Sequence, residues 1–232
     1  MGIKRVGIVQ SNYIPWKGYF DLINSVDEFI LYDEVQYTRR DWRNRNRIKT
    51  REGVQWLTVP VVVKGRYHQS IRETRISDPG WPRRHWETIR HNYARAPWFG
   101  SYEGLFADLY ERCTFESISE VNRFFLEAVC GLLGIKTKLS WAGDFRLVPH
   151  RTERLVDLCR QAGASHYLSG PSARAYLDDR LFAEAGISVS YIEYTGYPEY
   201  PQLFPPFEHA VSIIDLIFNT GPEACRYIKS FR

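Results

Sequence analysis

The order of apolar and polar positions predicts a chain in which short strands alternate with helices. Val6–Gln10 and Val26–Asp33 are short, apolar, β-prone runs, and Tyr19–Ser25 between them follows a helical pattern. A strand, a glycine-containing loop, a helix and a second strand form a βαβ unit, whose strands pair in parallel. The loop after the first strand then lies at the carboxyl edge of the sheet, where open α/β proteins bind ligands.

The rest of the chain continues this alternation and has a helix-rich stretch in its middle. Strands at 47–50 and 56–63 flank a turn at Glu52–Gly53, and further strands are predicted at 71–76, 137–142, 166–169 and 189–194. Helices are predicted at 81–93, 102–110, 117–133, 151–161, 173–185, 212–218 and 223–229. We therefore predict one α/β domain over residues 1–232, with a parallel-rich sheet, flanking helices and a helical insertion near 81–134.

Composition is that of a folded protein and excludes several other classes. Of the 232 residues, 44% are hydrophobic and 25% are charged, unlike disordered or fibrous chains. The apolar runs are too short for a membrane span, which needs about 20 residues. No signal-peptide pattern precedes the first strand, so we expect a cytoplasmic protein. The four cysteines have neither metal-ligand nor disulfide-framework spacing, and we predict no metal site.

Positive charge is concentrated in one segment. The formal net charge is only +4, which argues against nucleic acid as a partner. From Arg39 to Arg51, both included, there are six arginines and one lysine but a single acidic residue, Asp41. This density predicts an anionic ligand, most simply a phosphate, because arginine forks bind phosphate at two points. A solvated basic surface is the alternative.

Two predicted loops have the features of anion sites. In the segment from Gln10 to Tyr19, Pro15 and Gly18 shape a tight turn into a helix whose first N–H groups are free. The strand at 166–169 ends in a Ser-Gly pair, and Ser172 is the predicted N-cap of the helix that follows. Ordinary structural turns are the alternative for both. A proline-rich loop at 194–202 is a further candidate wall of the pocket.

These segments supply the predicted site residues. Two groups near strand ends are the candidate bases, Asp33 and His166. The predicted substrate- or nucleotide-binding residues are Gln10, Tyr13, Pro15, Gly18, Tyr19, Gln36, Tyr37, Arg39, Trp42, Asn44, Arg45, Asn46, Ser169, Gly170, Arg174, Tyr200 and Gln202. Aromatic rings beside amides and guanidinium groups suit a ligand that carries a base or a sugar ring.

The first of these loops resembles the strand–loop–helix segment F-x-P-x-H-x-G-H of nucleotidylyltransferases. Pro15 and Gly18 stand in similar places, but Trp16 or Lys17, and Tyr19, occupy the two histidine positions. The segment around Arg174 is loosely similar to the S-x-T-x-x-R segment of the same class. The resemblance implies a nucleotidylyltransferase-like, Rossmann-like core. The missing histidines argue against adenylyl transfer itself.

Motifs over nearly the whole chain resemble the WbqC-like family. They are Gln10-x-x-Tyr13-x-Pro15-x-x-Gly18-Tyr19, Asp33-x-x-Gln36-Tyr37, Trp42-x-Asn44-Arg45-Asn46, Leu57-x-Val59-Pro60, Tyr167-Leu168-Ser169-Gly170, Tyr200-x-Gln202 and Ser212-Ile-Ile-Asp215-Leu216. This family occurs with bacterial genes for surface polysaccharides and modified sugars. The resemblance implies an enzyme of O-antigen biosynthesis that attaches a small acyl or aminoacyl group, such as glycine, to an amino sugar carried on a nucleotide.

The implied reaction leaves its acyl source open. Amide formation needs an activated carboxyl group and a neutral amine. ATP with Mg²⁺, an acyl-adenylate and an acyl-carrier donor protein are the alternatives for the activated group. The expected partner is a nucleotide-linked sugar or another phosphorylated small molecule. The alternative function is that of a non-catalytic nucleotide- or nucleotide-sugar-binding partner in a glycan biosynthetic complex.

Overall fold

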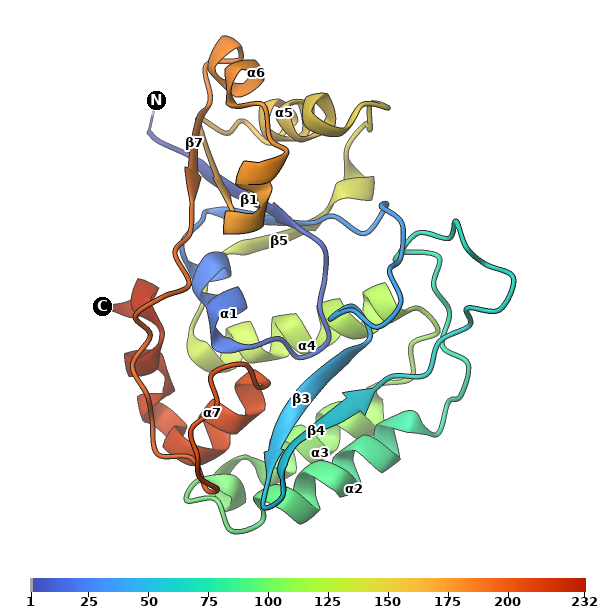
Figure 1. The fold of residues 1–232 in the computed structure, drawn as a ribbon, viewed down its shortest axis with the longest axis vertical. Helices are drawn as coiled ribbons and strands as arrows, with labels where there is room; N and C mark the ends of the chain where they lie inside the picture. The colour runs from blue at the N-terminus through green and yellow to red at the C-terminus, as the bar shows by residue number, and fades with distance from the viewer. Residues whose placement is uncertain (1) are drawn as a thin grey trace.

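A five-stranded parallel sheet occupies the upper half of the molecule as drawn in Figure 1, a computed structural model that describes residues 2–232 apart from the Arg151 side chain. Its strands are β1 (Arg5–Val9), β2 (Glu28–Leu31), β5 (Lys138–Trp141), β6 (His166–Ser169) and β7 (Ser188–Tyr191). They lie in the order β5-β2-β1-β6-β7, and every neighbouring pair is parallel. The predicted parallel α/β sheet is thereby confirmed. The winding direction reverses between β1 and β6, and ligands of doubly wound sheets bind at such a switch point.

Helices cover both faces of this sheet, because successive side chains of a strand point to opposite sides. Ile30 and its like-facing neighbours pack with α5 (Arg151–Gln161) and α6 (Asp179–Glu184) on one face. Phe29 and Leu31 join the larger core on the other face, where α1 (Lys17–Asn24) and α4 (Ile118–Leu133) lie. The two apolar clusters stay separate, as expected for a sheet buried on both sides.

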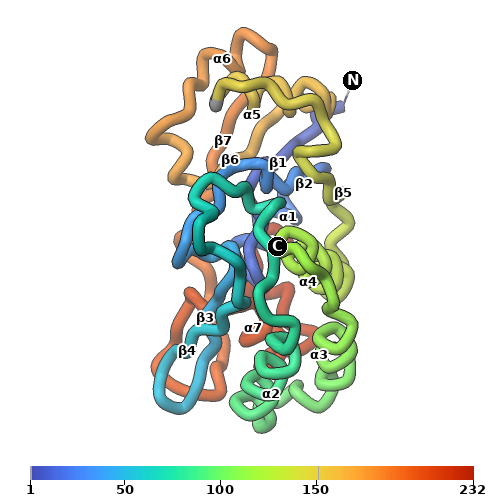
Figure 2. The backbone as a smooth tube through the Cα atoms, turned by 90° about the vertical axis from the view of Figure 1, so that its right-hand side faces the viewer, coloured from blue at the N-terminus to red at the C-terminus, as the bar shows by residue number. Residues whose placement is uncertain are grey.

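Between β2 and β5 the chain leaves the sheet and builds a second body of structure below it. This excursion contains the antiparallel hairpin of β3 (Arg45–Thr50) and β4 (Gly53–Thr58), then α2 (Trp81–Tyr93), α3 (Phe99–Arg112) and α4. Figure 2 shows the hairpin beside α2 and near α7 (Ile213–Thr220). The excursion begins well before residue 81, because the buried inner face of the hairpin shares one core with these helices.

Several predicted elements differ from the observed ones. The predicted helix at 173–185 is a 3₁₀ turn at Pro171–Ala175 followed by α6, because the Asp178 side chain accepts from the Arg180 N–H and starts a new helix. The predicted terminal helix is a pair of 3₁₀ turns, Gly221–Tyr227 and Lys229–Phe231. Only isolated bridges occur in the predicted strand at 71–76. Within residues 2–232, no helix has the length and apolar character needed to cross a membrane.

Candidate functional site

The loop between β1 and α1 is held in a strained conformation by the chain around β3. Ile14 has φ of +33°, a region that β-branched residues rarely adopt. The Asn46 amide donates to the carbonyls of Tyr13 and Ile14 at 3.0 and 2.8 Å, and the Tyr13 N–H donates to the Trp42 carbonyl at 3.1 Å. These bonds attach the first segment of the predicted site to the basic segment.

Gly18 is required by the position of one indole ring. A Cβ atom at Gly18 would lie 2.3 Å from the Trp16 side chain, which is far inside van der Waals contact. The same indole packs edge-on against Tyr194 and Tyr197, with ring centroids 5.2 and 5.5 Å apart. The glycine predicted for the turn therefore lets Trp16 fold back over the start of α1 and form a wall.

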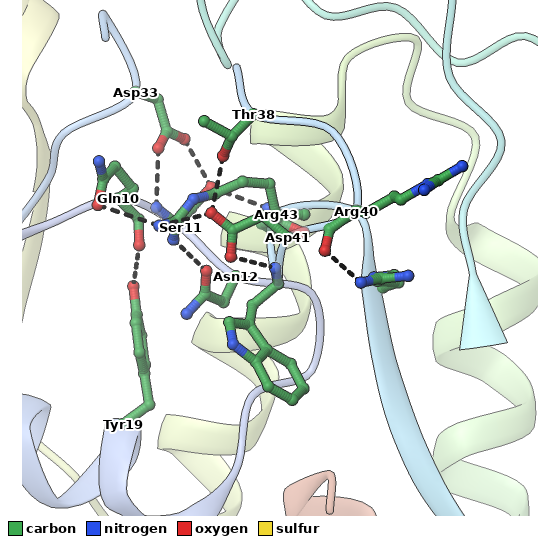
Figure 3. A network of polar contacts seen from close by, with 12 residues as sticks. Gln10, Ser11, Asn12, Tyr19, Asp33, Thr38, Arg40, Asp41 and Arg43 are labelled. Carbon is green, nitrogen blue, oxygen red and sulfur yellow. Dashed lines mark hydrogen bonds and ion pairs between the residues drawn. The ribbon is translucent and has the colours of Figure 1, made fainter. Parts of the chain in front are cut away.

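One arginine of the basic segment lies on the β1 loop (Figure 3). The Arg43 guanidinium donates to Asn12 Oδ1 and, at 3.2 Å, to Gln10 Oε1. Asp41 Oδ2 lies 3.6 Å from the same guanidinium, whose side chain is 13% exposed. Because its orientation is set by two amides and a carboxylate, Arg43 presents a fixed positive charge beside the carboxyl end of β1.

A small pocket opens next to this arginine. It has a volume of about 190 Å³ and is lined by Asn12, Pro15, Trp16, Trp42, Asn46 and Ala210. The Arg47 Nε donates to the Ala210 carbonyl at 2.9 Å and so ties the far wall of the pocket to β3. Two indoles and two amides around one ring-sized space, with Arg43 bonded to the lining Asn12, make this the candidate site.

Asp33, one predicted base, has no access to this pocket. It is fully buried and accepts the Ser11 N–H at 2.8 Å, the Ser11 hydroxyl at 2.7 Å and the Ser119 hydroxyl at 2.5 Å. Asn122 of α4 donates to the same Ser11 hydroxyl at 2.9 Å. The carboxylate therefore anchors the β1 loop to α4, and its contacts are those of a residue that positions the loop.

His166, the other predicted base, lies at the wrong edge of the sheet. It is the first residue of β6, and it pairs with Arg5 and Ser188 at the amino ends of their strands. Its ring nitrogens lie 2.8 and 2.6 Å from the hydroxyls of Ser188 and Ser190, and partial burial together with Arg5 lowers its pKa. The candidate pocket lies beyond the carboxyl ends of the strands, so the structure places His166 away from it.

The two predicted tyrosines of the first segment point away from the pocket. Tyr13 is buried, and its hydroxyl lies 2.7 Å from the Tyr110 hydroxyl and 2.9 Å from His85 Nδ1. Tyr19 donates its hydroxyl proton to the Gln10 carbonyl at 2.9 Å. Burial raises the pKa of both phenols well above the usual value. Both residues support the loop from the protein interior, and neither belongs to the pocket lining.

Four predicted residues of the second segment hold neighbouring backbone instead. Asn44, Gln36 and Arg39 each donate a side-chain N–H to a main-chain carbonyl between residues 59 and 67. Tyr37 is also buried, which raises its pKa to about 12, and its backbone N–H donates to the Gln69 carbonyl. These residues fold the 59–70 segment onto the region after β2.

The motif residues Tyr200 and Gln202 meet at a buried carboxylate. The Tyr200 hydroxyl and the Gln202 amide donate to Asp215 Oδ2 at 2.7 and 2.8 Å, and the Tyr93 hydroxyl donates to Oδ1 at 2.8 Å. Burial raises the pKa of Asp215, and the three donors oppose that shift. This network fixes the proline-rich loop on α7, so both predicted residues support the wall around Ala210 without lining the pocket.

The predicted residues after β6 stay outside the pocket. Ser169 is buried and donates to the Tyr167 hydroxyl at 3.1 Å. Gly170 precedes the 3₁₀ turn, and the predicted cap Ser172 makes no capping bond there. Arg174 lies over the Tyr191 ring at 4.8 Å. None of these residues belongs to the pocket lining.

The sequence interpretation missed several residues of this region. Asn12, Trp16, Arg43 and Ala210 were not among the predicted contacts, although the first three lie in the segments already singled out. Lys17 was also missed. Its ammonium group is buried, donates to the Pro198 carbonyl at 2.7 Å and lies 5.0 Å from the Tyr200 ring centroid. Burial lowers the pKa of Lys17 to about 8.

Residues 2–232 contain no cluster of three His, Cys, Asp or Glu side chains suited to hold a metal ion.

Comparison with known proteins identifies one family. The model of the WbqC-like protein family matches residues 10–227. The chain is also 53% identical over 230 residues to the uncharacterized protein Rv1507c of Mycobacterium tuberculosis, an alignment that covers 99% of this chain and 100% of that protein. No solved structure matches the chain.

Proposed function

Because this chain belongs to the WbqC-like protein family, we propose that it is an enzyme that attaches a small acyl or aminoacyl group to an amino sugar. Glycine is the expected group, and a nucleotide-linked amino sugar of bacterial glycan biosynthesis is the expected acceptor. The proposal rests on the family resemblance for the reaction and on the pocket beside the β1 loop for the ligand.

One observation supports the ligand class above all others. The Arg43 guanidinium is bonded to Gln10 and Asn12, and Asn12 lines the ring-sized pocket walled by Trp16 and Trp42. A sugar ring in the pocket would place its phosphate within the field of this guanidinium. The strand order, with a switch point beside β1, supports a Rossmann-like core of the nucleotidylyltransferase kind, in which phosphates bind at this loop.

The proposed reaction requires the protein mainly to position its two substrates. The amine nitrogen attacks the carbonyl carbon of the activated acyl group, a C–N bond forms, and the bond to the leaving group breaks. The proton lost by nitrogen passes to the leaving group or to water, since Asp33 and His166 lie away from the pocket. Holding both substrates in contact supplies the rate enhancement.

The positions of these two residues also favour a second candidate function. With both predicted bases away from the pocket, a non-catalytic protein that binds nucleotide-linked sugars for a partner enzyme accounts equally for the pocket and for Arg43.

Product analysis separates the two functions. The protein is incubated with nucleotide-linked amino sugars and glycine with ATP and Mg²⁺, or with an acyl-carrier donor, and the amide product is sought by mass spectrometry. We expect product with wild type and a loss of at least about tenfold with Arg43→Ala, the scale of one charge-assisted contact. Arg83→Ala is the matched control, because Arg83 is exposed and paired with Glu87 on α2.

Binding without product under every donor would favour the non-catalytic function. If the protein neither binds nor acylates any amino-sugar nucleotide, both proposed functions are contradicted.

A further inference from the structure

The candidate pocket is too small for the whole proposed substrate. Its volume is about 190 Å³, whereas pockets that bind drug-sized ligands have volumes of about 300–1,000 Å³. A single sugar ring fills such a space, so the phosphates and base of a nucleotide-linked sugar must lie on adjoining surface. Two residues lead from the pocket to that surface. Trp42 lines the pocket, and Arg47 donates to the carbonyl of the lining residue Ala210 at 2.9 Å.

The adjoining surface is the outer face of the β3–β4 hairpin. Asn44, just before β3, and Asn46 are buried, while Arg45 and Arg47 alternate with them and are partly exposed. The antiparallel register places Trp56 of β4 directly opposite Arg47. We call the set of Trp42, Arg45, Arg47 and Trp56 the Trp–Arg face.

Flat groups are stacked on this face and remain accessible. The Trp42 and Trp56 side chains are 38% and 41% exposed, and their ring centroids are 5.2 Å apart with an interplanar angle of 38°. The Arg45 guanidinium lies 4.1 Å from the Trp56 ring centroid, and the Arg47 guanidinium lies 5.7 Å from both indoles. Paired exposed indoles flanked by cations are typical of surfaces that bind a ring attached to an anion.

We propose that the Trp–Arg face is the nucleobase subsite of the substrate. The base stacks on the exposed indoles, the diphosphate lies between base and sugar against Arg47 and Arg43, and the sugar occupies the pocket. This inference rests on the proposed function for the sugar end only. It makes the enzyme selective for nucleotide-linked acceptors over sugar 1-phosphates, because stacking adds binding energy that a sugar phosphate lacks.

Titration of nucleoside diphosphates tests the subsite without any turnover. UDP, dTDP, GDP, ADP and inorganic pyrophosphate are titrated calorimetrically into wild type and Trp56→Ala. Since stacking on an aromatic side chain is worth about 1–3 kcal/mol per base, we expect Trp56→Ala to weaken nucleoside diphosphates about tenfold. Pyrophosphate, which has no base, keeps its affinity, and Trp56→Phe keeps most of the nucleotide affinity.

Val54→Ala is the matched control, because Val54 also lies on β4 and is 42% exposed. The inference is overturned if Trp56→Ala and Val54→Ala have equal effects on nucleoside diphosphates, or if pyrophosphate weakens as much as UDP. The inference is also overturned if Trp56→Ala weakens binding of an oligosaccharide, which has no base, as strongly as it weakens binding of UDP. That result would assign the face to carbohydrate.

A second variant separates this inference from the proposed function. Ala210→Trp fills the pocket and leaves the Trp–Arg face in place. If it abolishes binding of amino-sugar 1-phosphates while Trp56→Ala leaves nucleoside diphosphates unaffected, the subsite is refuted and the proposed function stands. If Trp56→Ala weakens nucleoside diphosphates but no amino sugar is bound or acylated, the subsite stands and the proposed function is refuted.

Discussion

The loops after β1 and β6 lie side by side at the switch point of the sheet, yet only one of them is covered by other structure. The loop after β1 is bonded to Trp42, to Asn46 and, through the Pro15 carbonyl, to Ile213. The segment after β6 is mostly exposed, and its backbone bonds are local, such as that from the Ala173 N–H to the Gly170 carbonyl. A sheet edge thus becomes a pocket only where an inserted hairpin folds over it.

The largest expected contrast between the two loops is in stability. Asp33→Ala leaves three buried donors on Ser11 and Ser119 without their acceptor, so we expect a loss of about 3–5 kcal/mol in the free energy of unfolding. Ser169→Ala, behind the other loop, removes one hydroxyl bond to Tyr167 and should cost about 1 kcal/mol. Urea denaturation of both variants measures the difference, and equal losses would contradict the comparison.

A smaller contrast is expected from the residues that touch the loops directly. Asn46→Ala removes two amide bonds to the carbonyls of a strained loop, and we expect it to cost about 2–3 kcal/mol. Ser172→Ala changes an exposed side chain after β6 and should stay within about 0.5 kcal/mol. Thermal unfolding followed by circular dichroism checks this pair. A stable Asn46→Ala protein would mean that the loop conformation does not depend on β3.

Lys17, at the end of the loop after β1, makes the stability of this region depend on pH. Its pKa in the folded protein is about 8, below the ordinary 10.5, so the unfolded chain binds more protons between these values. Stability should therefore rise as pH increases from about 8 to 10.5, by at most about 3 kcal/mol for this group. Lys17→Met removes the buried charge and should lose that rise. Denaturation curves at about pH 7.5, 9 and 10 compare the two proteins, and parallel pH profiles would count against a buried ammonium.

The smallest expected effect is at the exposed arginine after β6. Arg174 contacts the Tyr191 ring at the surface, so Arg174→Ala should change stability by less than about 0.5 kcal/mol. It should also leave nucleoside diphosphate affinity unchanged, whereas Arg43→Ala reduces it. Calorimetric titration of UDP into both variants is the measurement. A clear loss of affinity in Arg174→Ala would bring the β6 loop into the site.

Local signals predicted the elements well where one segment decides its own structure. The helices at 81–93 and 151–161 and the strand at 166–169 have the predicted bounds, because their apolar periodicity and flanking breakers are local properties. The predicted helix at 173–185 was wrong, since Asp178 caps a second, shorter helix. The candidate site was predicted only in outline. Its segments were identified, but neither predicted base reaches the pocket.

The amino-acid sequence alone specifies a parallel α/β sheet, the glycine turn into α1 and a basic segment after β2, because periodicity, turn chemistry and charge are properties of neighbouring residues in the chain. Which side chains of those segments face a ligand was settled by packing between distant parts. Asp33, Tyr13 and Asp215 were drawn into buried hydrogen-bond networks, while Arg43 was left at the pocket. A buried polar side chain needs a hydrogen-bond partner, and the partners of these three lie 22, 97 and 15 residues away in sequence, so only the fold brings them together.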